Sequence, residues 1–204
     1  MRRFFHLSLI AATVAAATSC GDVVRQDRAP VLLIINSLQG APTGGFGSGT
    51  FTNTLFSDVE VLRTSPAPCS ATSPCPTTFA DLGQVSLTTS LKNVSLAPTT
   101  NNQVTITRYR VDYVRTDGRN TPGVDVPYGF DGGVTGSITV GGIVSLSFEL
   151  VRHSAKDEAP LAQLKANGNV IHTTARVTFY GHDAVGNDIS VTGSLTVDFG
   201  NFGD

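Results

Sequence analysis

Tryptophan is absent from this 204-residue chain, and charged residues are scarce, at 15% of the total. The 14 basic and 16 acidic residues leave a formal net charge of −2, and no segment gathers lysine and arginine. Proteins that bind nucleic acids need such clusters to neutralise phosphates, so we expect no nucleic-acid partner. Glycine, serine, threonine and valine are abundant instead, which is typical of strands and tight turns rather than of helices.

Long apolar runs are also missing. The apolar run from Leu7 to Ala17 has about 11 residues, which fits the core of a signal peptide but not the roughly 20 residues of a membrane span. It follows Arg2 and Arg3, which supply the positive start of an export signal. We therefore expect residues 1–19 to be a signal peptide and the rest of the chain to be exported.

This signal ends in Ala17-Thr18-Ser19-Cys20, with small residues directly before the cysteine. The segment resembles the lipobox of bacterial lipoproteins, although that family usually has leucine at the place of Ala17. The resemblance implies that Cys20 becomes the first mature residue, carries acyl chains and anchors the protein in the cell envelope. Gly21 stands where lipoproteins kept in the inner membrane have aspartate, so the outer membrane is the expected location. The alternative is a secreted protein whose Cys20 lies beside an ordinary cleavage site.

Only two cysteines follow Cys20. Because an exported protein meets an oxidising compartment, Cys69 and Cys75 are expected to form a local disulfide. A zinc site is the alternative, but two thiols are too few and no histidine lies near them in the sequence. We expect neither a metal nor a cofactor.

Alternation of apolar and polar residues predicts strands along most of the chain. The most regular pair is 171–180 and 189–199, which the turn at 182–188 joins into a hairpin. Other strands are predicted within 31–35, 51–63, 85–96, 104–106, 109–113, 134–140 and 143–153. The run at 31–35 is continuously apolar, as in a strand buried on both faces, and Gly-rich turns are expected over 36–50.

Breaks in the alternation predict local irregularities. The apolar phase changes at Thr107-Arg108 and again within 91–94, and each change indicates a bulge. Gly141-Gly142 is a two-residue turn signal, so the strands on either side are expected to form a hairpin.

Three segments are expected to lie outside the strands. Residues 64–78 contain four prolines and both of the later cysteines, which favours an excursion that pairs with no strand. Residues 116–133 are predicted to form a long loop. The only predicted helix lies within 154–167, with Leu161 and Leu164 packed inward.

The turn Asp183-Ala184-Val185-Gly186-Asn187 resembles the D-x-x-G-N turn in the last hairpin of bacterial immunoglobulin-like domains. The resemblance covers 171–199 and implies an all-β, antiparallel two-sheet immunoglobulin-like sandwich, with no activity attached. About seven to nine strands and one short helix fit such a fold. The tryptophan and the inter-sheet cysteine pair of antibody domains are missing, so the relationship is distant. We expect a tether over 20–30 and one sandwich domain over 31–204.

Loop carboxylates are the candidate ligands for calcium, which takes six to eight oxygens. They are Asp117, Asp125, Asp131, Asp183 and Asp188. Aspartate also begins turns by bonding its own backbone, which is the simpler explanation. Three aromatic residues near the same loops are candidates for stacking on sugar rings. They are Tyr128, Phe130 and Tyr180.

No catalytic set is predicted. The sequence has no G-x-S-x-G elbow and no phosphate-binding loop that opens a helix. Three histidines follow Cys20, and His153, His172 and His182 are all expected to be solvated. The leading hypothesis is a non-catalytic, lipid-anchored envelope protein with a structural, adhesive or interaction role. A calcium- or carbohydrate-binding module using 116–133 and 182–188 is the second hypothesis, and an envelope enzyme is the third.

Overall fold

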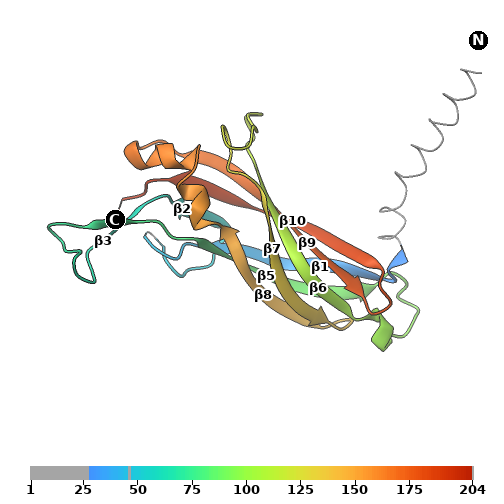
Figure 1. The fold of residues 1–204 in the computed structure, drawn as a ribbon. Coiled ribbons are helices and arrows are strands. Elements are labelled where there is room, and N and C mark those ends of the chain that lie inside the picture. The colour runs from blue at the N-terminus through green and yellow to red at the C-terminus, as the bar shows by residue number, and fades with distance from the viewer. Residues whose placement is uncertain (1–27, 46, 204) are drawn as a thin grey trace, which may run out of the picture.

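The computed structural model describes residues 28–45 and 47–203, which are mostly strands in two large sheets (Figure 1). The smaller sheet has three strands in the order β1 (Val31–Ala41), β5 (Asp81–Leu91) and β8 (Ile143–Val151). The larger sheet has five, in the order β2 (Thr54–Asp58), β10 (Asp188–Gly200), β9 (Ile171–Asp183), β6 (Val104–Val114) and β7 (Phe130–Ile138). All neighbours are antiparallel except β2 and β10, which are parallel. The prediction of an all-β chain is confirmed.

The core lies between the two sheets and is built from the inward residues of both. An aromatic cluster at its centre replaces the missing tryptophan: the ring centroids of Tyr109 and Phe148 are 4.9 Å apart, and those of Phe148 and Phe179 are 5.3 Å apart. Tyr109 and Phe179 come from the larger sheet and Phe148 from the smaller one. Burial of one such side chain contributes about 1.5–3 kcal/mol to stability, so the packing of these rings is a main stabilising contact between the two sheets.

The predicted bulge in β6 is confirmed. The register of β6 shifts between Ile106 and Arg108 against both of its neighbours. The extra residue restores the inward phase, so Ile106 before the bulge and Tyr109 after it are both buried. The terminal hairpin of β9 and β10 is confirmed as well, with an unbroken register from Asp188 to Phe199.

The predictions for β1 and β5 were wrong in part. β1 continues to Ala41, past a bulge between Ile35 and Ser37, and it is not buried on both faces: Leu32 is 48% and Ile34 is 40% exposed. One face of the smaller sheet is therefore solvated, as is common in antiparallel sheets. β5 ends at Leu91 instead of bulging, because Asn93 begins a turn by accepting the N–H of Ser95.

Gly141 and Gly142 form a turn, but the predicted hairpin is wrong. β7 pairs with β6 and β8 pairs with β5, so this turn carries the chain from one sheet to the other. The N–H of Gly142 donates to the Thr139 carbonyl at 2.8 Å, and the N–H of Gly141 to the Thr89 carbonyl at 2.9 Å. Gly141 has a φ of +77°, a conformation that favours glycine. Residues 130–133, predicted to lie in the preceding loop, belong to β7.

The predicted helix is present as two short pieces. They are α3 (His153–Lys156) and the 3₁₀ helix η2 (Leu161–Ala166), separated at Pro160, which lacks the N–H that a continuous helix needs. Leu161 and Leu164 are buried, as predicted. A further 3₁₀ turn, η1 (Thr100–Asn102), precedes β6. Among the described residues, no helix has the length and apolar character of a membrane span.

Residues 61–77 form an arm that projects from the sheets (Figure 1). The prediction that this segment pairs with no strand was wrong, because β3 (Val61–Arg63) and β4 (Cys75–Thr77) form a separate two-stranded ribbon. The sulfur atoms of Cys69 and Cys75 are joined, with their Cα atoms 5.3 Å apart. The disulfide closes the outer part of the arm.

The strands run between two opposite ends of the molecule. The described chain enters β1 where Val31 lies opposite Leu91, and the tip of the terminal hairpin lies beside it; we call this the entry end. The other end, here the far end, holds the arm, the helical segment and the loop 115–129 (Figure 1). A strand of eleven residues such as β6 separates the two ends by about 36 Å.

A buried ion pair fastens the far end. Nζ of Lys156 lies 2.8 Å from Oδ2 of Asp81, and each side chain is 1% exposed. The same ammonium group donates to the carbonyl of Asp58 at 2.7 Å, and the hydroxyl of Ser57 donates to Oδ2 of Asp81 at 2.6 Å. Lys156 thus connects α3 to the first residue of β5 and to the last residue of β2.

Burial raises the pKa of Asp81, while the charge of Lys156 and the hydrogen bonds from Lys156 and Ser57 oppose the shift. The neighbouring Tyr113 hydroxyl donates to the Leu150 carbonyl at 2.7 Å, and burial, followed by the charge of Asp81, raises the pKa of this phenol. Removal of one charge would leave its partner uncompensated in the core, which is far costlier than removal of both.

We predict that Lys156→Met destabilises the protein by about 3–5 kcal/mol at neutral pH. Without the ammonium group the folded-state pKa of Asp81 rises further. A raised folded pKa contributes stability below the unfolded value and loses it as pH rises, so the variant should be less unstable near pH 4 than near pH 7. Urea unfolding at both pH values measures this. Asp81→Asn in the same chain should recover much of the loss, and a double variant as unstable as Lys156→Met would contradict the prediction.

We predict that Cys69→Ser with Cys75→Ser loosens the arm more than the sheets. A loop this short can contribute at most about 2 kcal/mol through the unfolded chain, and the arm forms a sheet of its own. Limited proteolysis should cut within 64–74 sooner than in the unchanged protein, while the midpoint of thermal unfolding moves little. A large fall in that midpoint without faster cleavage would show the opposite.

Candidate functional site

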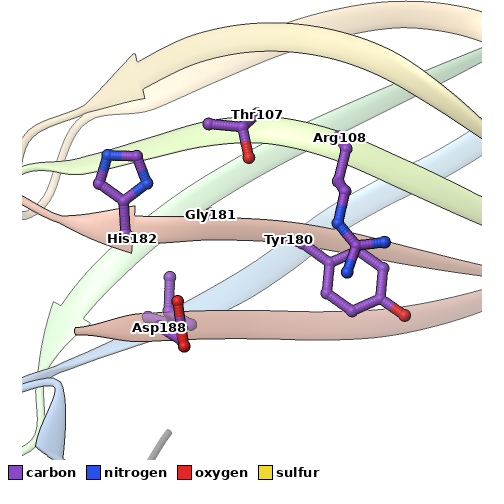
Figure 2. A pocket seen from close by; sticks show the side chains of 7 residues that line it. Thr107, Arg108, Tyr180, Gly181, His182 and Asp188 are labelled. Atoms are coloured by element: carbon purple, nitrogen blue, oxygen red, sulfur yellow. The ribbon is translucent and has the colours of Figure 1, made fainter. Parts of the chain in front are cut away.

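A polar pocket of about 320 Å³ lies on the outer face of the larger sheet, at the β6 bulge. Its walls come from three neighbouring strands, and Figure 2 shows how they lie. The lining residues are Thr107, Arg108, Tyr180, Gly181, His182, Asp188 and Ile189. Gly181 is one of these lining residues, and the adjacent strand lies so close to it that a side chain there would collide with the Thr105 carbonyl. Bulges frequently re-aim side chains beside functional sites, and this one directs Thr107 and Arg108 outward.

Arg108 forms one wall of the pocket and is held in place twice. Its guanidinium carbon lies 3.8 Å from the centroid of the Tyr180 ring, and Nη1 lies 3.1 Å from Oδ1 of Asp131. Arg110 bonds the second oxygen of Asp131 at 2.8 Å and also Asp112 at 2.8 Å. These groups are largely exposed, so their main effect is to fix orientation rather than to add stability.

His182 and Asp188 form the other wall. They lie directly opposite each other in the ladder of β9 and β10. Within 28–45 and 47–203, no hydrogen bond or ion pair engages either side chain. The imidazole of His182, the carboxyl group of Asp188 and the fixed guanidinium of Arg108 therefore surround one small space. Such a set can donate to and accept from the hydroxyl groups of a small polar ligand.

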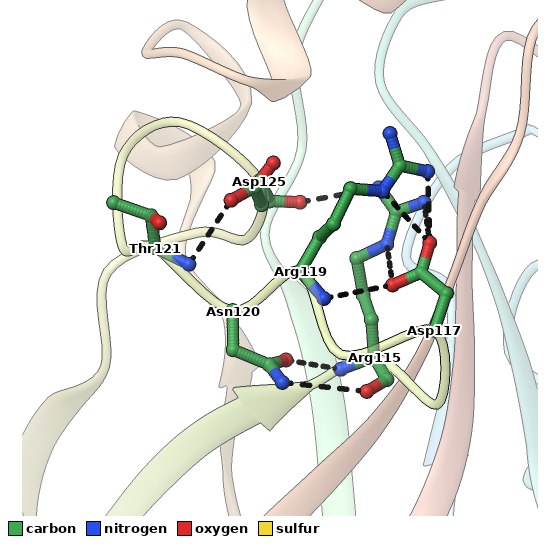
Figure 3. A network of polar contacts seen from close by, with 6 residues as sticks. All are labelled: Arg115, Asp117, Arg119, Asn120, Thr121 and Asp125. Atoms are coloured by element: carbon green, nitrogen blue, oxygen red, sulfur yellow. Dashed lines mark hydrogen bonds and ion pairs between the residues drawn. The ribbon is translucent and has the colours of Figure 1, made fainter.

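At the far end, the loop 115–129 is ordered by its own polar network (Figure 3). Asp117 receives two guanidinium groups, from Arg115 at 2.6 Å and from Arg119 at 2.8 Å. Asn120 accepts the N–H of Arg115 at 2.6 Å, and Asp125 accepts the N–H of Thr121 at 3.2 Å. The hydrogen bonds from Arg115, then those from Arg119, lower the pKa of Asp117. The hydrogen-bonding oxygens of the Asp117 carboxylate are thus occupied by contacts within the loop.

The structure does not bring the five candidate acids together. Asp183 lies at the entry end, where its Oδ1 accepts the N–H groups of Val185 at 3.1 Å and Asn187 at 2.8 Å. Asp117 and Asp125 lie at the far end, about a full strand length away. In the described ranges, no group of three acidic, histidine or cysteine side chains is placed to hold a metal ion. Of the two segments in the second hypothesis, the loop 115–129 lies at one end of β6 and the turn 182–188 at the other, so the structure does not bring them together.

The three candidate aromatic residues form no common platform. Phe130 is buried against Tyr109, with its centroid 6.2 Å away, and Arg152 lies over its ring at 4.7 Å. Tyr180 is covered by Arg108, and Tyr128 is exposed in the loop at the far end.

Two other histidines lie apart from the pocket. His172 is 74% exposed, yet its Nδ1 lies 2.9 Å from Oδ1 of Asp198. His153 is the exposed first residue of α3. Neither the role of Arg108 in the pocket nor the pairing of Lys156 with Asp81 was predicted from the sequence. The predicted bulge in β6 could have indicated that Arg108 points outward beside a site. Nothing in the sequence links Lys156 to Asp81.

Cys20, the predicted lipid-attachment residue, lies outside the described residues, as does the predicted signal peptide. Comparison with known proteins adds no relationship: no family model, curated protein or solved structure matches this chain.

We predict that Asp117→Asn speeds hydrogen exchange at the Arg119 amide, which donates to Oδ1 of Asp117 at 3.1 Å. In the unchanged protein the Arg119 amide should stay protected at pH values below the ordinary pKa of aspartate. The lowered pKa keeps the carboxylate charged there, and protection should be lost only as pH falls through it. Exchange monitored by mass spectrometry or NMR measures the effect. Asp131→Asn, which also loses arginine contacts, should leave Arg119 unchanged, and equal exchange in both variants would count against the network.

Proposed function

We propose that this protein is a lipid-anchored component of the bacterial cell envelope. Cys20 carries the lipid, and the folded domain acts by interaction rather than by catalysis. The support for the anchor is the lipobox-like segment Ala17-Thr18-Ser19-Cys20 after an export signal. Two acyl chains make a membrane anchor stable, whereas one chain binds only marginally. The outer membrane is the proposed location.

The observation that carries the interaction role is the placement of the two ends. The described chain starts at Arg28, eight residues after Cys20, and enters at one end of the strands. The arm, the helical segment and the ordered loop 115–129 all lie at the opposite end (Figure 1). An anchor at Cys20 therefore leaves the far end available to a protein or glycan partner. Loops held by a rigid scaffold are where proteins most often bind.

We also propose that the fold is an immunoglobulin-like sandwich. Two mainly antiparallel sheets over one core support this assignment. The terminal turn supports it too, because Asp183 bonds two backbone N–H groups of the turn and the side chain of Asn187 at 2.7 Å. These contacts give a physical reason for the D-x-x-G-N pattern: aspartate closes the turn, Gly186 adopts a φ of +87°, and asparagine returns to the aspartate.

Binding of a small polar ligand is a second candidate function. The pocket beside the β6 bulge favours it, because His182 and Asp188 face one space near a fixed guanidinium group. A volume of about 320 Å³ is at the small end of ligand sites, which suits a ligand of monosaccharide size. A glycan array probed with the full protein and with Asp188→Asn tests this function. Binding that the substitution abolishes is expected, and a blank array contradicts it.

We predict that clickable palmitate labels the unchanged protein and that Cys20→Ala abolishes the label. The same substitution should move the protein from the membrane fraction to the soluble fraction, because the acyl chains are lost. Cys69→Ser with Cys75→Ser is the matched control and should keep both label and membrane attachment. Equal labelling of Cys20→Ala, or no labelling of the unchanged protein, would overturn the proposed anchor.

A further inference from the structure

Apolar side chains are exposed on the turns at the entry end of the molecule. Val94 and Leu96 lie in the segment that follows β5, Ile143 directly follows the turn between the two sheets, and Val185 lies at the tip of the terminal hairpin. All four side chains are more than half exposed, and Val94 is 87% exposed. A single apolar residue on a surface is ordinary, whereas several gathered at one place indicate a contact surface.

These turns lie together because the strands that they follow are paired. Val104, the first residue of β6, pairs with Asp183 of the terminal hairpin and with Ile138, the last residue of β7. The N–H of Lys92 donates to the carbonyl of Pro30 at 2.9 Å, which holds the segment after β5 beside the start of β1. All the turns therefore surround the point where the described chain enters the sheets (Figure 1).

The exposed apolar surface continues onto the outer face of the smaller sheet. Ile34 lies opposite Thr88 of β5, and Thr88 lies opposite Ile143 of β8, so the two isoleucines point to the same face. Leu32, two residues before Ile34, shares that face. We call Leu32, Ile34, Val94, Leu96, Ile143 and Val185 the entry patch.

The length of chain before the described residues indicates what covers the entry patch. This step rests on the proposed lipid anchor at Cys20. Eight residues lead from Cys20 to Arg28, the first described residue, and they can span at most about 29 Å. The strands hold the far end about 36 Å beyond the entry end. A bilayer that holds Cys20 thus lies within reach of the entry patch, while the far end points away from it.

We propose that the entry patch inserts into the surface of the bilayer in which Cys20 is anchored. Apolar side chains at such a depth lie at the boundary between headgroups and acyl chains. The segments 92–103, 139–143 and 184–187 contain no acidic residue, so none of them is repelled by anionic headgroups. The patch is then a second attachment beside the lipid. It makes the domain stand on the membrane in one orientation, with the far end turned outward.

A dye placed at each end of the lipidated full-length protein tests this orientation. Val94→Cys is labelled with an environment-sensitive dye, since the lipid at Cys20 and the Cys69–Cys75 disulfide leave no other thiol. Val124→Cys is the matched control, because Val124 is also an exposed valine, at 66%, but lies in the loop 115–129 at the far end. Each protein is mixed with vesicles of phosphatidylethanolamine and phosphatidylglycerol, with and without nitroxide-labelled lipid as a quencher, and is floated on a density gradient.

We expect both proteins to float with the vesicles. The emission of the Val94→Cys dye should shift to the blue and be quenched by the nitroxide lipid, whereas the Val124→Cys dye should show neither effect. Floating protein with an unquenched dye at Val94→Cys overturns the proposal and leaves the anchor in place. Protein that does not float contradicts the anchor and the insertion together. A blue shift without quenching assigns the patch to a protein contact, and equal quenching at both positions means that the domain has no fixed orientation; each result overturns the proposal.

A second variant tests whether the apolar side chains cause the insertion. Ile143→Asp with Val185→Asp, made in the Val94→Cys chain, places two charges in the entry patch without touching the dye position. The dye should lose most of its quenching, because carboxylates at the surface oppose insertion beside anionic lipids. Val124→Asp in the same chain should leave the quenching unchanged. Quenching that survives the double substitution contradicts the proposal.

Discussion

An ammonium group and a carboxylate, both withdrawn from water, determine how the far end of this molecule is built. Lys156 reaches from α3 to Asp81 at the start of β5 and to the backbone of Asp58 at the end of β2. These segments belong to different layers, and the arm leaves the sheets directly after Asp58. Apolar contacts between the sheets can form in many arrangements. The ion pair allows only one, because either charge buried without its partner would be strongly destabilising.

The sheets themselves follow from the alternation of the sequence. The terminal hairpin, the β6 bulge and the buried leucines of η2 could all be predicted, because each depends on the period of nearby residues. β1 was predicted to be buried on both faces because 31–35 are all apolar, but one face of the smaller sheet is solvated. The end of β5 could have been predicted from the sequence, since Asn93 forms a local turn. The partner of each strand beside Gly141-Gly142 was not, because the choice between a hairpin and a crossing between sheets depends on β5 and β6.

The candidate sites were harder to predict than the fold. Aspartates in loops looked alike in the sequence, yet the structure uses each differently: Asp117 binds two arginines, Asp183 closes a turn, and Asp188 faces the pocket. Their grouping depends on which ends of the strands they occupy, and a sequence without strand partners does not contain that information. Arg108 became part of the pocket through a bulge that was predicted and a cross-strand tyrosine that was not.

The way the chain enters has a mechanical consequence. β1 lies at an edge of the smaller sheet, and ten residue pairs hold it to β5 alone among the described strands. A pull on the amino-terminal side, resisted at the far end, acts along β1 rather than across it. The ladder is then loaded in shear, so its hydrogen bonds share the tension instead of opening one after another. Forced unfolding is governed by the height of the unfolding barrier. In this geometry the barrier includes the simultaneous loss of the whole β1–β5 pairing.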